Sequence, residues 1–336
     1  MRSAEAPIEG TGAMTAEVTA RVLGASGYTG AETLRWLFGH PRVRVVGATA
    51  NKHAGKRLDT LWPQFAGATD LVLGTEAPPA DVTFLCLPHG EASKLAPTLT
   101  GTVIDLSGDH RLPEPAHSAA YGFPRQTDPW IYGLPELGHA RMRGATRVAN
   151  PGCFATALAL ALLPMQGALP SVVSAVGLTG STGSGATPTA TTHHPARAEN
   201  LRPYKVLEHQ HVPEVVAACG GGFTLDFVPM SAPLRRGILV TVPLPALAGG
   251  GATFERYRAF YEGNPLVRVL SAPPDLHGVL GSARADLGVV EKDGRAVVFC
   301  AIDNLCRGAG SQAVANLNLV MGWPVDLGLR TLPPVP

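Results

Sequence analysis

A glycine-spaced loop near the start of the chain constrains its fold more than any other feature. Residues 18–24 are predicted to form a β-strand, the pattern Gly24-x-x-Gly27-x-x-Gly30 follows, and residues 31–38 have the apolar spacing of a helix. Small residues in such a loop let the backbone approach a pyrophosphate, and the helix N-terminus supplies amide donors and positive potential. Three spaced glycines also occur in ordinary tight turns, but this strand-loop-helix context predicts a dinucleotide-binding site. The other loop residues expected to bind the cofactor are Ser26, Tyr28 and Thr29.

The second predicted strand, residues 44–48, ends without the acidic residue that binds a ribose 2′-hydroxyl. Thr49, Asn51 and Lys52 stand there instead. Hydroxyl, amide and ammonium groups suit a 2′-phosphate, so the sequence favours NADP over NAD. The alternative interpretation is a solvated loop whose lysine binds no ligand.

The chain is predicted to be an α/β protein of two domains, since 336 residues exceed the length of a typical single domain. Strands alternate with helices up to about residue 150, which is typical of a parallel sheet with crossover helices. Longer alternating strands follow, such as residues 237–242 and 296–302, and these suit a half-exposed, largely antiparallel sheet. We therefore expect a nucleotide-binding domain over residues 17–152 and a catalytic, substrate-binding and oligomerisation domain over residues 153–304. Residues 1–16 are expected to be a disordered extension.

The bulk composition argues against several classes of partner. The net charge is only +1, so neither a nucleic acid nor a membrane surface is expected as a partner. No run of about 18 apolar residues or signal-peptide pattern is present. The five cysteines form no C-x-x-C pair, which disfavours a zinc site or a disulfide framework and predicts a reducing, cytoplasmic location.

Asn150-Pro-Gly-Cys153 lies where a loop is predicted to enter a helix. The first amides of a helix can stabilise a thiolate and lower its pKa, and a thiolate is the best protein nucleophile near neutral pH. Cys153 is therefore a candidate nucleophile. The alternative is a buried packing cysteine, which is the more common role of a single cysteine.

His209-Gln-His211-x-x-Glu214 places two imidazoles and a carboxylate within six positions. A cysteine nucleophile needs a nearby imidazole to move protons, and a carboxylate often orients that imidazole. His209, His211 and Glu214 are thus candidate catalytic residues. A polar surface turn is the alternative, and a metal site is disfavoured because no cysteines or further acidic ligands accompany them.

Two later segments have features of substrate-binding sites. Gly180-Ser-Thr-Gly-Ser-Gly185 follows a predicted strand and is either a phosphate nest of backbone amides or a flexible loop; Ser181, Gly183 and Ser184 are its candidate ligands. A locally basic segment then suits a carboxylate or an acidic partner, with a solvated charged face as the alternative. Its candidate residues are His194, Arg197, Arg202, Tyr204 and Lys205.

These features occur together in the order of a known family. The chain resembles the N-acetyl-gamma-glutamyl-phosphate reductases of arginine biosynthesis and the related reductases of carrier-protein-linked aminoadipyl phosphate in lysine biosynthesis, over roughly residues 18–330. The motifs that carry the resemblance are Gly24-Ala-Ser-Gly-Tyr-Thr-Gly30, Asp105-Leu-Ser-Gly-Asp-His-Arg111, Tyr132-Gly-Leu-Pro-Glu136, Asn150-Pro-Gly-Cys-Phe-Ala-Thr156, His209-Gln-His-Val-Pro-Glu214, Arg236-Gly-Ile-Leu239 and Ala301-Ile-Asp-Asn-Leu-Cys-Arg-Gly308.

The resemblance implies a Rossmann domain, an α+β catalytic domain like that of glyceraldehyde-phosphate dehydrogenase, and NADPH as cofactor. It implies that Cys153 is the nucleophile, that the histidine pair transfers protons, and that a C-terminal helix, about residues 305–330, returns to the cofactor domain. A homo-oligomer, dimer or tetramer, is expected. Further expected cofactor contacts are Pro88, Asn304 and Gly308; further expected substrate contacts are Arg111 and Asn150.

Short sequence motifs indicate to which branch of the family the chain is more similar. Phe154-Ala155 replaces the Tyr-Pro of the arginine-type enzymes, and the His-His-Pro-x-Arg segment from His193 resembles the lysine type. Asn150-Pro-Gly and the Gly180–Gly185 loop are instead similar in sequence to the arginine type. On this balance the sequence favours a carrier-linked aminoadipate 6-phosphate reductase, with the glutamyl analogue as a further candidate substrate and the arginine-type enzyme as the alternative.

Two rivals remain outside these branches. An aspartate-semialdehyde dehydrogenase shares the chemistry but is expected to have a different cysteine neighbourhood and no His-x-His-x-x-Glu block. A non-catalytic NADP-binding regulator would keep the glycine loop without any use for a cysteine beside a histidine pair.

Overall fold

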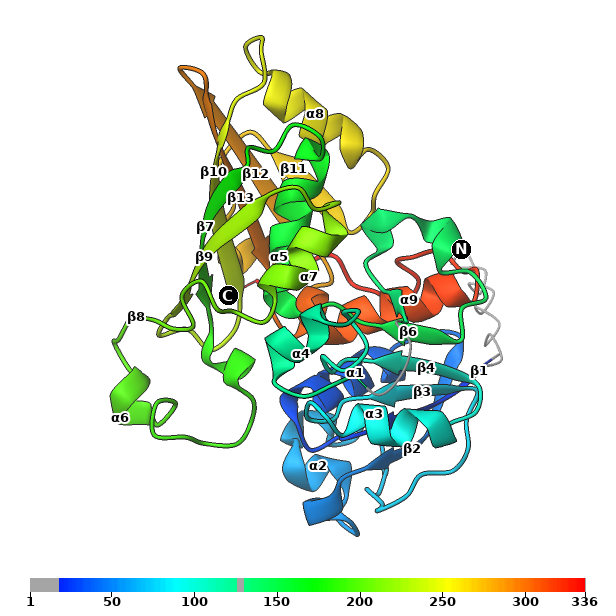
Figure 1. Ribbon diagram of the computed structural model, residues 1–336. Helices are drawn as coiled ribbons and strands as arrows, with labels where there is room; N and C mark the ends of the chain where they lie inside the picture. The colour runs from blue at the N-terminus through cyan, green and yellow to red at the C-terminus, as the bar shows by residue number, and fades with distance from the viewer. Residues whose placement is uncertain (1–17, 126–129, 336) are drawn as a thin grey trace, which may run out of the picture.

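The computed structural model describes residues 18–125 and 130–335, so the extension predicted for residues 1–16 lies outside the described residues. Two β-sheets form the centres of two domains that lie one above the other in Figure 1. Among the described residues, no helix has the length and apolar character needed to cross a bilayer. No cluster of metal-binding side chains is found there either.

The first sheet has six parallel strands in the order β2-β1-β3-β4-β6-β5. The strands are β1 (Val18–Leu23), β2 (Val43–Thr49), β3 (Val82–Leu85), β4 (Thr102–Asp105), β5 (Ile131–Tyr132) and β6 (Arg147–Ala149). Strands β3 and β4 are buried along their whole length, as expected for a parallel sheet covered on both faces. The chain order reverses between β1 and β3, and ligands of such sheets bind at the carboxyl ends beside that point.

Helices from both ends of the chain cover this sheet. Helix α1 (Tyr28–Phe38) follows β1 directly, and α9 (Ser311–Val320) packs against it in the same apolar core. A π-helical turn, Cys306–Gly310, precedes α9. The other helices are α2 (Leu58–Leu61), α3 (Ala92–Leu95) and α4 (Ala116–Tyr121).

The second sheet has seven strands in the order β11-β12-β13-β10-β7-β9-β8. These strands are β7 (Val172–Thr179), β8 (Arg202–Pro203), β9 (Thr224–Ser231), β10 (Ile238–Pro245), β11 (Val267–Leu270), β12 (Ala285–Lys292) and β13 (Arg295–Ile302). Four of its six strand pairings are antiparallel, as predicted, but the sheet is mixed, because β7 pairs in parallel with β9 and β11 with β12. A parallel pair needs a crossover connection, and the long segment that carries the basic residues and α7 (Val212–Ala218) provides it between β7 and β9.

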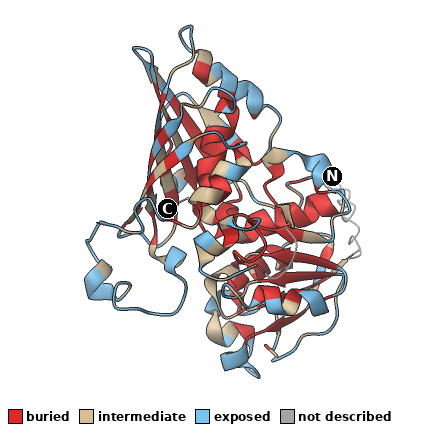
Figure 2. Ribbon diagram, in the orientation of Figure 1, coloured by how far each residue is buried: buried red, intermediate tan, exposed pale blue. Residues whose placement is uncertain are grey.

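One face of this sheet is covered and the other is open. Helix α5 (Cys153–Leu162) packs between the sheet and α7, and nine of its ten residues are buried. Figure 2 shows this helix mostly in the colour of buried residues. Exposed and buried residues alternate along β7, and the exposed ones lie on the opposite, open face. Among them, Val172 is 51% exposed. Helix α8 (Ala252–Phe260) lies at the end of the domain, and the short α6 (His194–Arg197) projects away from its body (Figure 1).

Candidate active site

A cavity of about 840 Å³ lies between the two domains. Its wall combines the glycine loop after β1, the end of β3, the start of α5 and the turn after β13. The basic segment and the histidine pair complete it. Sequence motifs separated by more than 280 residues therefore meet at one site.

The glycine loop has the shape required to hold a dinucleotide. A Cβ atom on Gly24, where φ is +98°, would lie 2.3 Å from the carbonyl oxygen of Cys86, and one on Gly30 would lie 2.3 Å from that of Gly24. Gly27 differs, since its nearest neighbour would be 3.8 Å away and it lines the cavity. Gly27 also caps α1 without a side-chain hydrogen bond, which leaves the helix N-terminus open to a phosphate.

The candidate residues at the end of β2 differ in burial: Thr49 is buried, whereas Asn51 and Lys52 are exposed. Thr49 is 9% exposed, and its carbonyl oxygen accepts hydrogen bonds from the amides of Gly24 (3.2 Å) and Ala25 (2.8 Å). Thr49 therefore supports the loop. Asn51 and Lys52 lie in the short 3-10 helix Asn51–His53, exposed and outside the cavity wall, where their side chains are free to extend.

Two aromatic residues near this loop were not anticipated. The Trp62 indole Nε1 donates to the Ala25 carbonyl oxygen at 3.2 Å, and its ring lies 5.7 Å from that of Tyr28. His89 follows the predicted contact Pro88 in the cavity wall, and its Nδ1 accepts from the Gly108 amide at 2.8 Å. The contacts of Trp62 with Ala25 and of His89 with Gly108 join segments that are distant in the sequence, so no local pattern indicates them. The one available signal was the Pro-His-Gly that follows β3, which contains His89.

Cys153 is the first residue of α5 and lines the cavity. The turn after β13 rests directly on it, since a Cβ atom on Gly308 would lie 2.7 Å from the Cys153 Cβ. Burial raises the pKa of the Cys153 thiol to about 11, although the Phe154 amide and the charge of Arg111 lower it. The start of the helix lowers the thiol pKa, as expected, but burial raises it by more. The thiol therefore needs a proton acceptor to react at neutral pH.

Alkylation of Cys153 by iodoacetamide is therefore expected to accelerate about tenfold per pH unit between pH 7 and 10, because only the thiolate reacts. The measurement is mass-spectrometric labelling of the Cys153 peptide at each pH, with Cys153→Ser as the blank. A rate that levels off below pH 8 would show that the resting site already holds a thiolate.

The two histidines pack beside the start of α5, where Cys153 lies. A Cβ atom on Gly152 would lie 2.2 Å from His211 Nε2, so this imidazole touches the backbone that precedes Cys153. The His211 amide donates to His209 Nδ1 at 3.2 Å, and the two rings lie 4.6 Å apart. His209 is enclosed by three aromatic rings, those of Phe154, Tyr204 and Phe227.

The surroundings of both imidazoles favour their neutral form. Burial, reinforced by the charges of His211 and Lys205, lowers the pKa of His209 to about 2. Burial, reinforced by Arg111 and His89, also holds the pKa of His211 well below its usual value. A neutral imidazole has a free nitrogen that can accept a proton, and His211 is in contact with Gly152, the residue before Cys153.

Glu214 does not orient an imidazole by a hydrogen bond. Its nearest approach to a histidine is 4.0 Å, from Oε1 to His211 Nε2. Four other groups donate to its carboxylate at 3.0–3.1 Å: the Arg111 guanidinium, the Tyr121 and Tyr132 hydroxyls and the Gly152 amide. The carboxylate thus holds the peptide before Cys153. Neither tyrosine was predicted as a site residue, although Tyr132 begins one of the family motifs.

Arg111 is buried and fixed on three sides. Besides Glu214, its Nε donates to the Asn150 carbonyl oxygen and its Nη2 to that of Leu106, both at 2.8 Å. Asn150 is held in turn, because its Oδ1 accepts from Asn316 Nδ2 of α9 at 3.0 Å. Both residues line the cavity, so a fixed positive charge faces the space beside Cys153.

The glycine-rich loop is more fully bonded than its sequence predicts. The amides of five of its residues already donate to backbone carbonyl oxygens; they are Gly180, Ser181, Thr182, Gly183 and Gly185. A phosphate nest built from these amides is therefore not supported. Gly183 and Ser184 line the cavity, whereas Ser181 lies outside its wall and donates from Oγ to the Arg235 carbonyl oxygen at 3.4 Å.

The basic segment borders the same cavity. Arg197, Arg202, Tyr204 and Lys205 line it, whereas His194 is exposed and lies outside its wall. Arg197 Nη2 donates to the Ala232 carbonyl oxygen at 3.3 Å, and Lys205 Nζ to Gln210 Oε1 at 2.9 Å. Across the cavity Asn304 donates from Nδ2 to Thr182 Oγ1 at 3.0 Å, which joins the turn after β13 to the glycine-rich loop.

Comparison with known proteins accounts for both domains. Residues 19–145 match the semialdehyde dehydrogenase NAD-binding domain, and residues 153–304 match the semialdehyde dehydrogenase dimerisation domain. An N-acetyl-gamma-glutamyl-phosphate reductase of Thermus thermophilus is 39% identical over 92% of this chain and 97% of its own length. The chain belongs to the N-acetyl-gamma-glutamyl-phosphate reductase family.

Other relatives include both predicted branches. An N-acetyl-gamma-glutamyl-phosphate reductase of Salinispora tropica is 42% identical, with coverage of 92% of this chain and 96% of its own. A [LysW]-L-2-aminoadipate 6-phosphate reductase of Deinococcus radiodurans is 36% identical, with 95% and 98% covered. The chain is thus an oxidoreductase of amino-acid biosynthesis that acts as a phosphorylating, semialdehyde-forming dehydrogenase.

The same fold occurs in the solved structure of an aspartate semialdehyde dehydrogenase II of Vibrio cholerae, which superposes with a TM-score of 0.68. The two sequences are 14% identical, and the superposition covers 90% of this chain and 98% of that one. At this identity the likeness establishes the fold alone: a parallel nucleotide-binding sheet joined to a mixed catalytic sheet. The predicted fold class is confirmed.

Proposed function

We propose that this protein reduces N-acetyl-gamma-glutamyl phosphate to its semialdehyde with NADPH, through a thioester on Cys153. The observation that carries the proposal is the placement of Cys153 beside the neutral His211 in a cavity that also contains the open dinucleotide loop. The sequence alone favoured the carrier-linked substrate, but the relatives at 39% and 42% identity give more weight to the arginine-type one.

The first half-reaction uses groups of this chain alone. The Cys153 sulfur attacks the acyl carbon, its proton passes to His211, and the carbon–oxygen bond to phosphate breaks, so that phosphate leaves with the electron pair. The Phe154 amide stabilises negative charge on the sulfur, and the positive charge of Arg111 attracts the phosphate. The product of this step is an acyl thioester.

The second half-reaction reduces that thioester. NADPH, when bound on the Gly24–Gly30 loop, supplies the hydride for this reduction. The carbon–sulfur bond of the resulting hemithioacetal then breaks as its oxygen re-forms a carbonyl. The Cys153 thiolate that leaves takes up a proton by way of His211, and the semialdehyde is released.

The substrate is tested by a side-by-side assay. Purified protein is given N-acetyl-gamma-glutamyl phosphate or carrier-bound aminoadipyl phosphate, and NADPH oxidation is followed at equal substrate concentrations. We expect kcat/KM for the acetylated substrate to exceed that for the carrier-bound one by at least about tenfold, which corresponds to roughly 1.4 kcal/mol. The opposite preference would assign the carrier-linked activity.

The basic segment favours that second candidate. Arg197, Arg202 and Lys205 border the cavity with only Glu199 on the acidic side of the segment, a larger positive surface than one small carboxylate requires. An acidic carrier protein would use such a surface to speed and orient its encounter with the site.

If the carrier is the partner, raising salt is expected to increase the apparent KM for carrier-bound substrate, because the screening length falls from about 10 Å at 0.1 M to about 3 Å at 1 M. Arg197→Ala/Arg202→Ala should lose most of this salt dependence. The same titration with acetylglutamyl phosphate is the control. Equal salt dependence in the wild type and the double variant would remove the segment from carrier docking.

NADP preference is tested at Lys52. Its exposed ammonium follows β2, and we propose that it contacts the 2′-phosphate. Loss of one charge-assisted contact costs roughly 1.5–3 kcal/mol, about tenfold to a hundredfold in affinity, so Lys52→Glu should weaken NADPH strongly and NADH little. Fluorescence titration with both cofactors measures this. The exposed Lys56→Glu, on the same stretch of chain, is the matched control, and equal weakening of NADPH and NADH by Lys52→Glu would contradict the role.

We also propose that the protein assembles as a homo-oligomer, a dimer or a tetramer. Support comes from the match to a dimerisation domain and from the open face of the second sheet, where Val172 and Val176 are 51% and 42% exposed. Large exposed apolar side chains that gather on one face are typical of an interaction surface.

A further inference from the structure

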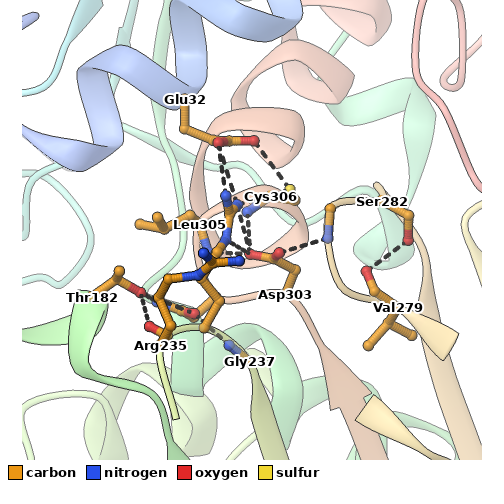
Figure 3. A network of polar contacts seen from close by, with 12 residues as sticks. Glu32, Thr182, Arg235, Gly237, Val279, Ser282, Asp303, Leu305 and Cys306 are labelled. Atoms are coloured by element: carbon orange, nitrogen blue, oxygen red, sulfur yellow. Dashed lines mark hydrogen bonds and ion pairs between the residues drawn. The ribbon is translucent and has the colours of Figure 1, made fainter. Parts of the chain in front are cut away.

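A cluster of buried acidic groups and partly buried arginines joins the two domains. We call Glu32, Arg35, Arg236, Asp303 and Cys306 the interdomain cluster. Figure 3 shows its members Glu32, Asp303 and Cys306 close together, with dashed lines marking the polar contacts around them. Glu32 is 6% exposed, and Asp303 and Cys306 are fully buried. Two carboxylates face two guanidinium groups, so the buried charges compensate one another.

Arg236 is the bridge of this cluster. Its Nη2 lies 3.2 Å from Glu32 Oε2 and 3.0 Å from Asp303 Oδ1, and it also donates to Cys306 Sγ at 3.3 Å. Glu32 belongs to α1 of the nucleotide-binding domain, whereas Asp303 follows β13 of the catalytic domain. One guanidinium thus links carboxylates of the two domains.

On the catalytic side, Asp303 fixes the turn that rests on the nucleophile. Its Oδ1 accepts from the amides of Leu305 (2.9 Å) and Cys306 (3.1 Å), and its carbonyl oxygen accepts from the Gly308 amide at 3.0 Å. Gly308 in turn has no room for a side chain against Cys153. The position of this turn therefore follows the position of Asp303.

On the cofactor side, Glu32 lies about one helical turn beyond Tyr28, the first residue of α1. The helix also touches the turn directly, since a Cβ atom on Gly310 would lie 3.0 Å from the Thr33 amide nitrogen. A shift of α1 would therefore move the dinucleotide loop relative to the turn and to Cys153.

We propose that Arg236 is a positioning residue that keeps the dinucleotide loop and Cys153 at the separation that hydride transfer requires. The inference rests on the proposed function. Formation of the thioester uses Cys153, His211 and Arg111, and Glu214 and the Asn150 carbonyl oxygen hold Arg111 beside Cys153 without the bridge. Reduction of the thioester also requires the Gly24–Gly30 loop in register. Loss of the bridge therefore slows reduction more than acylation, because small misplacements of reacting groups have large effects on rate.

The experiment separates the two half-reactions in Arg236→Met. Phosphate released from N-acetyl-gamma-glutamyl phosphate without NADPH, measured by rapid quench, reports acylation. Single-turnover oxidation of NADPH by the acylated protein reports reduction, and the emission of NADPH bound to unacylated protein reports the fixation of its ring. We expect acylation within about twofold of wild type. Reduction should be slower by about tenfold to a hundredfold, with weaker NADPH emission.

Arg268→Met is the matched control. Arg268 also pairs with a buried carboxylate, Asp286, with 2.6 Å between Nη2 and Oδ2, but both residues belong to the catalytic domain. This control should leave the ratio of the two rates at its wild-type value. If Arg236→Met slows acylation as much as reduction, so that the ratio of the two rates is unchanged, the proposal is overturned.

Arg236→Lys covers the case in which the methionine variant fails to fold. A lysine keeps the charge but cannot form the planar fork that joins two carboxylates, so reduction should again slow more than acylation. An unchanged ratio in this variant also overturns the proposal. Absence of a phosphate burst from the wild-type protein would instead refute the proposed function, so the two failures are distinguishable.

Discussion

Replacing Cys153 with serine is expected to abolish reduction of the acyl phosphate while leaving NADPH binding intact. The serine hydroxyl fits the same position at the start of α5 but is a much weaker nucleophile, and no thioester can form. By comparison with the loss of other covalent nucleophiles, kcat should fall by at least about a thousandfold. Steady-state NADPH oxidation and a fluorescence titration with NADPH measure the two effects.

Cys219→Ser is the matched control for this substitution. Cys219 is buried at the end of α7 and lies outside the cavity wall, so the change should leave turnover per folded molecule close to wild type. Near-normal turnover by Cys153→Ser, or a loss of NADPH binding that accounts for the inactivity, would refute the nucleophilic role.

The parts of the site that the sequence predicted are those encoded in short contiguous motifs. The Gly24–Gly30 loop needs small residues because two of its glycines touch backbone oxygens, and that requirement is visible as a spacing. The start of α5 at Cys153 and the closeness of His209 to His211 are likewise local. Such motifs predict a geometry without knowledge of the rest of the fold.

The parts that could not be predicted depend on contacts between distant segments. Tyr121 and Tyr132 donate to Glu214 across 93 and 82 positions, and nothing near Glu214 indicates which hydroxyl groups will reach it. The parallel pairing of β7 with β9 depends in the same way on the path of the crossover. The raised pKa of Cys153 reflects burial, which is a property of the assembled domains rather than of the helix start.

Removal of the Glu214 carboxylate is expected to be the most destabilising change in the site. Glu214→Ala leaves the Arg111 guanidinium buried without its counter-charge and frees the Gly152 amide and two tyrosine hydroxyls. Breaking a buried ion pair by removing one partner costs about 3–5 kcal/mol, which is a large share of a typical free energy of unfolding. Urea denaturation followed by fluorescence measures the difference.

Glu214→Gln separates charge from shape at the same position. The amide keeps the volume and one acceptor oxygen, but its NH2 group faces donors that need an acceptor, so an intermediate loss of about 1–3 kcal/mol is expected. The exposed pair of Glu91 with Lys94, 2.7 Å apart, gives the control: Glu91→Gln should cost less than about 1 kcal/mol. If Glu214→Ala is no more destabilising than Glu91→Gln, the carboxylate does not hold the site together. Since the Gly152 amide precedes Cys153, the folded fraction of Glu214→Gln should also form the thioester more slowly than wild type, which links this contact to catalysis as well as to stability.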